Sequence, residues 1–121
     1  MTMLILALIS AAWLLWGVSN PPAVNVGYVP AQGQVEALGG LNLGVCDIAV
    51  TPIFAAASAA LQQAIILHEV GHCLGLAHST SPADIMFPTV TDPPSITVPS
   101  WHDLYRYHQT FQFHAFIPAV T

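Results

Sequence analysis

The stretch HEVGHCLGLAH, residues 68–78, decides the fold, because it places three histidines and one glutamate within eleven positions. On an α-helix, residues four apart stand one turn above each other, so His68 and His72 can direct imidazole nitrogens to one point. On a continuing helix His78 would lie about 9 Å further along the axis and on a different face. Gly75 can take the left-handed conformation that turns the chain back, and this brings the third histidine to the first two.

This spacing predicts a zinc site. Zinc takes nitrogen ligands at about 2.0–2.1 Å, and a site with three protein ligands keeps a fourth position for a water, whose pKa the metal lowers. Glu69 projects from the same turn as His68, and we expect it to act as the general base of a peptide hydrolysis. A single histidine on an apolar helix is usually an ordinary structural residue. The longer pattern H-E-x-x-H-x-x-G-x-x-H has five fixed positions, which seldom match by chance.

Length and charge limit the other functions. A chain of 121 residues is long enough for one domain. Charged residues make up 6% of it, Arg106 is its single lysine or arginine, and its formal net charge is −5. Binding to nucleic acid is therefore not expected, because phosphate contacts need a basic face. The expected partner is a peptide or protein substrate.

Residues 3–18 are almost continuously apolar and end at Ser19-Asn20-Pro21-Pro22. Their length falls between a signal-peptide core and a bilayer span. We expect residues 1–19 to be an N-terminal signal peptide or membrane anchor and residues 20–121 to be the catalytic domain. The protein would then be extracytoplasmic, either secreted or associated with the membrane through residues 3–18. The alternative is a buried core helix. Cys46 and Cys73 can form one disulfide in an exported protein or remain two buried thiols.

The rest of the chain alternates turn residues with short apolar runs. Strands are predicted over 43–50 and, more weakly, over 25–29 or 34–38, with a turn at Gly39-Gly40. One long helix is predicted to begin at Thr51-Pro52, with its most secure part over 59–74. An irregular, proline-rich loop follows over 79–99. A closing helix of about 101–111 begins at the capping pair Ser100 and Asp103.

These residues together resemble the metzincin metallopeptidases, in their matrixin branch (the matrix metalloproteinase family). In that family the extended zinc motif is followed by a methionine turn. HSTSPADIMFP, residues 78–88, looks like the stretch that joins the two, and SWHDLYRY, residues 100–107, is similar to the start of the family's C-terminal helix. The resemblance implies one catalytic zinc bound by His68, His72 and His78. It also implies that Met86 forms a hydrophobic floor under the metal and that Phe87 and Pro88 lead into the wall of the substrate pocket.

The resemblance implies an α+β fold, a small zincin- or metzincin-like domain. Its reduced mixed sheet would pack on a long active-site helix, followed by the Met-turn loop and a C-terminal helix. The likeness covers residues 43–111 and thins out upstream. The family's five-stranded sheet and its additional helix before the active-site helix do not fit the residues available, so at least one strand and that helix are expected to be missing. No histidine precedes His68 and acidic residues are few, so the family's structural zinc and calcium ions are not expected.

The predicted function is that of a zinc-dependent endopeptidase that binds an extended peptide by strand addition. Two rivals stay open. The missing upstream elements favour a non-catalytic zinc-binding or peptide-binding relative. The apolar composition favours a small membrane-anchored subunit of a larger assembly. His102, His108 and His114 recur every six residues, which fits neither a helical face nor a usual metal pattern, so we interpret them as surface or packing residues.

Overall fold

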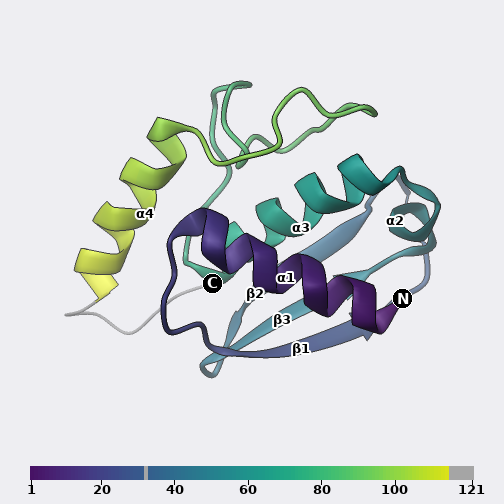
Figure 1. Ribbon diagram of the computed structural model, residues 1–121, viewed down its shortest axis with the longest axis horizontal. Helices are drawn as coiled ribbons and strands as arrows, with labels where there is room; N and C mark the ends of the chain where they lie inside the picture. Colours follow the sequence, from purple (N-terminus) through teal and green to yellow (C-terminus); the bar gives the residue numbers. More distant parts are fainter. Residues whose placement is uncertain (32, 115–121) are drawn as a thin grey trace.

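Three strands form a small mixed sheet in the order β1-β3-β2 (Figure 1). The computed structural model describes residues 1–31 and 33–114, with side chains as far as residue 110. β1 (Ala23–Tyr28) pairs in parallel with β3 (Val45–Val50), and β2 (Ala37–Asn42) pairs antiparallel with β3. β2 is therefore an edge strand of this sheet, and its outer side carries backbone groups that can pair with an added strand.

A two-residue turn, Leu43-Gly44, connects β2 to β3. Its φ angles are 51° and 81°, and two positive φ values are the signature of the type I′ turn that suits the twist of a hairpin. The predicted turn at Gly39-Gly40 is wrong, because both glycines lie inside β2. Two strands were expected and three form. Glycines within β2 weakened its strand pattern, and the reason for Gly39 is its contact with the active-site helix, described below.

Two helices replace the single long helix that the sequence predicts after Thr51. α2 (Pro52–Ala56) ends at Ala57, which is extended, and α3 (Ala59–Cys73) begins after Ser58. The Ser58 hydroxyl accepts a hydrogen bond from the Leu61 amide at 3.2 Å, so Ser58 caps α3. The Thr51 hydroxyl caps nothing, because it donates to the carbonyl of Val35 at 2.7 Å. The break lies at the serine because serine is a good N-cap.

α1 (Thr2–Trp16) lies beside α3, and both pack on the same face of the sheet (Figure 1). The Trp16 indole N–H donates to the Leu67 carbonyl of α3 at 2.9 Å. The core between the two helices and β3 consists of apolar residues from all three: Ile5, Ile9, Trp13, Trp16, Cys46, Ile48, Val50, Ile66 and Val70. A helix does precede the active-site helix, since α1 lies ahead of α3 and packs on it. That the family's own additional helix is missing stays a prediction.

This packing of α1 is the one expected of a core helix, the alternative considered for residues 3–18. It does not test whether residues 1–19 also act as a signal peptide or anchor, which stays a prediction. Among the residues that the structure describes, none of the helices has both the length and the apolar content needed to cross a membrane.

The remaining elements close the domain. A disulfide joins Cys46 of β3 to Cys73 at the end of α3, with 5.3 Å between the Cα atoms. Residues 79–99 contain no helix or strand, as expected, and α4 (Trp101–His114) extends three residues further than predicted. The fold class is confirmed: a small α+β domain in which a reduced mixed sheet packs on α3, followed by an irregular loop and a C-terminal helix.

Candidate active site

Three imidazole rings meet at the C-terminal end of α3. His68 and His72 stand one turn apart on the helix, and His78 reaches them from the segment that follows. Their ring centroids form a near-regular triangle with sides of 4.8, 4.9 and 5.2 Å. One ligand atom of each ring lies within 4.8 Å of the others, so within the described residues these three histidines make a group able to hold a metal ion.

The chain reverses direction directly after α3. Gly75 has a φ of 89°, the left-handed conformation expected for it. The Gly75 amide donates to the His72 carbonyl at 3.0 Å and the Leu76 amide donates to the Gly71 carbonyl at 3.1 Å. This pair of bonds is the Schellman motif, which ends a helix. The sole arginine, Arg106 of α4, donates to the Ala77 carbonyl at 3.0 Å and so holds the residue before His78.

Hydrogen bonds fix the orientation of two of the rings. Nδ1 of His68 donates to the Ile85 carbonyl and Nδ1 of His72 donates to the Leu76 carbonyl, both at 2.7 Å. Because a carbonyl can only accept, Nδ1 carries the proton, and the Nε2 lone pair is free for a metal. Burial lowers the pKa of His68 to about 4 and also lowers the pKa of His72. Both rings are therefore neutral at pH 7, which is the form that binds zinc, and the residues fit that ion.

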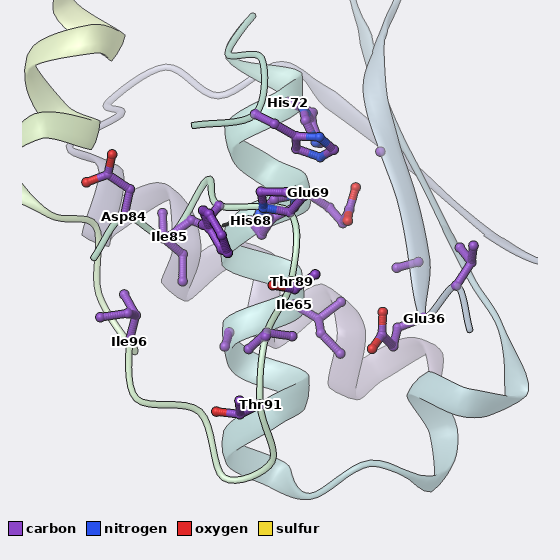
Figure 2. A pocket seen from close by; sticks show the side chains of 18 of the residues that line it. Glu36, Ile65, His68, Glu69, His72, Asp84, Ile85, Thr89, Thr91 and Ile96 are labelled. Atoms are coloured by element: carbon purple, nitrogen blue, oxygen red, sulfur yellow. Dashed lines mark hydrogen bonds between the residues drawn. The ribbon is translucent and has the colours of Figure 1, made fainter. Parts of the chain in front are cut away.

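Glu69 lies on the neighbouring face of α3 and extends toward the cleft (Figure 2). Its side chain is buried, and burial together with the negative charge of Glu36 raises the pKa of its carboxyl to about 8. A cation held by the histidines would lower that pKa again. The β2 backbone passes directly over Glu69, since a Cβ added at Gly39 would lie 2.8 Å from the Glu69 Cβ. Only glycine fits at this point of β2.

Met86 is fully buried against the turn of α3 that carries His72. A Cβ added at Gly71 would lie 2.3 Å from the Met86 sulfur and 3.0 Å from Cζ2 of Trp16. Because Gly71 has no side chain, both the loop after His78 and the helix α1 can lie close to α3 at this point. The structure thus brings Met86 to the helix that carries the first two histidines, and its role as a floor under the metal stays a prediction.

Asp103 fixes the loop around Met86 by hydrogen bonds to its backbone. It is fully buried, and its carboxylate accepts backbone hydrogen bonds from Ile85 at 2.7 Å, Met86 at 3.4 Å and Ser100 at 2.8 Å. The sequence predicted Asp103 as the partner of Ser100 in a helix cap, and the Ser100 hydroxyl does accept from the Asp103 amide at 2.9 Å. The cap pattern gave no indication of the bonds to Ile85 and Met86, because those depend on the path of the loop.

Asp84 fixes the same loop through hydrogen bonds to other side chains. Its carboxylate accepts from the hydroxyls of Ser79 at 2.5 Å and Ser100 at 2.6 Å, and from Nδ1 of His102 at 2.6 Å. Burial acts to raise the pKa of Asp84, but the hydrogen bonds from Ser100, Ser79 and His102 outweigh it and lower the pKa. His102, predicted as a surface or packing residue, is half exposed and bonds to this buried carboxylate.

A cavity of about 620 Å³ opens beside the histidines (Figure 2). One wall is the segment 34–39, which leads into β2, and the other is the loop 82–96; α3 forms its base. Phe87 and Pro88 line the loop wall of this cavity. The sequence did not indicate Glu36, which lines the opposite wall, because an isolated glutamate between turn residues carries no recognisable pattern.

Comparison with known families bears on the same part of the chain. The model of the matrixin family matches residues 33–112, which include β2, β3, α3, the histidine cluster, the loop and most of α4. A search of curated proteins gave no match to this chain.

Proposed function

The chain belongs to the matrixin family, a family of metallopeptidases, and from that premise we propose that it is a zinc-dependent endopeptidase. One observation carries the proposal: three imidazoles, two of them neutral and oriented by carbonyls, converge beside a buried glutamate at one end of an open cleft.

His68, His72 and His78 would hold the zinc ion. When bound there, zinc supplies an activated water and polarises the scissile carbonyl. Glu69 takes the proton of the attacking water and passes it to the leaving amine. The free edge of β2 pairs with the backbone of an extended peptide and holds the scissile bond over the histidines. Met86 and Asp103 act on the reaction only by supporting α3 and the loop.

Replacing Glu69 with Gln tests this assignment. The variant keeps the shape of the side chain and removes the base, so we expect zinc to remain bound while kcat/KM for a fluorogenic peptide falls about 10²- to 10⁴-fold. Asp47→Asn is the matched control, because it removes one negative charge from the face of the sheet opposite the buried side chains of β3. Cleavage by zinc-loaded Glu69→Gln at the wild-type rate would contradict the mechanism.

The same assay decides between the proposal and a non-catalytic relative. The wild-type protein with one zinc bound should cleave members of a peptide panel, and a chelator should abolish the cleavage. A protein that binds zinc and peptides but cleaves none of the panel would support the non-catalytic alternative.

We also propose that the protein is exported. The Cys46–Cys73 disulfide supports this, because such bonds persist in oxidising compartments. The burial of Trp16 and Ile5 in the core favours retention of residues 1–19 in the mature protein, since their removal would uncover the back of α3. Intact-mass spectrometry of the exported protein tests this: a mature chain that starts near residue 20 would contradict retention.

A further inference from the structure

The cavity beside the histidines is apolar over most of its surface. Its base includes Ile65 of α3, and its loop wall carries Ile85, Phe87 and Ile96. An alkyl chain that entered from a peptide lying along β2 would therefore contact hydrocarbon on two sides.

Glu36 places a carboxyl group on the opposite wall. Figure 2 shows it across the cavity from Thr91 and Ile96, on the same side as Glu69. Its backbone is fixed, because its carbonyl accepts hydrogen bonds from both the amide and the hydroxyl of Thr51 at 3.0 Å. Its side chain is half-buried, and in the described part of the chain it forms no hydrogen bond or ion pair. The carboxylate is thus available to a ligand.

Among the described residues, no lysine or arginine lines the cavity beside this carboxylate. The single arginine of the chain, Arg106, is bonded to the Ala77 carbonyl and does not line the cavity. A zinc ion at the histidines would offset the charge of Glu69, which lies next to His68. Glu36 therefore presents an acidic group to the cavity with no lysine or arginine beside it in the described part of the chain.

We propose that Glu36 determines specificity by selecting a substrate with lysine or arginine at the position whose side chain enters this cavity. The methylene stem of such a side chain covers Ile65 and the loop wall, and its charged end forms an ion pair with Glu36. This proposal rests on the proposed peptidase function and names its substrate class.

Two peptides that differ only in lysine or norleucine at that position test the proposal, because norleucine keeps the stem and lacks the charge. Mass spectrometry of digests of a mixed peptide library identifies the position. For the wild type we expect kcat/KM to favour the lysine peptide about five- to tenfold, the size of a partly exposed ion pair. Glu36→Gln should remove the preference and Glu36→Lys should reverse it. Asp47→Asn, with the same net charge as Glu36→Gln, should keep it.

A binding measurement separates this proposal from the peptidase function. Hydroxamate peptides bind through the metal and need no turnover, so a series with lysine or norleucine at each position in turn identifies the position without cleavage. The ratio of the two dissociation constants at that position reports the cavity alone. If no peptide is cleaved but the lysine hydroxamate binds more tightly and Glu36→Gln abolishes the difference, the specificity proposal holds and the peptidase proposal fails. If the ratio is the same in wild type and in both Glu36 variants, the specificity proposal is overturned.

Discussion

The two walls of the cleft are built in different ways. β2 is held along its whole length by pairing with β3, from Ala37 opposite Val50 to Asn42 opposite Val45. The loop wall, residues 79–99, has no regular structure, and buried carboxylates on Asp84 and Asp103 hold its first part. The β2 wall is therefore stabilised by many backbone hydrogen bonds, whereas the first part of the loop wall depends on two side chains.

This difference separates the roles of single residues. On the loop side, one carboxylate satisfies several backbone amides, so its loss leaves those buried donors without partners. On the β2 side, backbone pairing with β3 holds the strand, and what matters is the space left for Glu69. We therefore expect the largest loss of stability from a mutation in the loop wall, and a change of activity without a comparable loss of stability from a mutation in β2.

The largest effect is expected for Asp103→Ala. The change leaves the amides of Ile85, Met86 and Ser100 without their acceptor, so we expect a loss of about 3 kcal/mol or more in the free energy of unfolding. Urea denaturation measures it. Asp47→Ala, on the face of the sheet opposite the buried side chains of β3, is the control and should change stability by less than about 0.5 kcal/mol. Equal stability of the two variants would show that the loop does not depend on Asp103.

A smaller effect on stability, with a larger one on activity, is expected for Gly39→Ala. The new methyl group would meet Glu69 at 2.8 Å, so β2 or Glu69 must shift, at a cost of about 1–3 kcal/mol. At a temperature where the variant is still folded, its rate of peptide cleavage should fall by more than the small decrease in the folded fraction explains. Gly27→Ala in β1 is the matched control, because its methyl group would lie an ordinary 3.9 Å from the Ala49 Cβ. If both variants keep full activity, the close approach of β2 does not position Glu69.

The smallest effect is a pH dependence carried by Asp84. Its pKa is lowered in the folded protein, so its contribution to stability is present above the unfolded value of about 3.8 and is lost as the pH falls below it. The melting temperature of the wild type should therefore fall more steeply between pH 4 and pH 2 than that of Asp84→Asn, while the variant is the less stable protein at pH 7. Parallel melting curves over that range would assign the acid sensitivity to other carboxyl groups.

The sequence predicted the loop side of the site better than the β2 side. The three histidines and Gly75 stand at fixed spacings that the helix and its left-handed stop convert directly into geometry, whereas Met86 was expected only from the resemblance. Gly39 and Glu36 have roles that depend on which element lies opposite them, and spacing along the chain does not contain that information. The packing of α1 in the core could not be predicted either, because a helix that is apolar on all sides does not indicate which face contacts another element.

The zinc K-edge X-ray absorption spectrum of the protein loaded with one zinc per chain tests the central claim, that three histidines hold the metal and leave a position for water. The expected spectrum shows three imidazole nitrogens at about 2.0–2.1 Å and one further oxygen ligand. A site with two imidazoles, or one with a sulfur ligand, would contradict it.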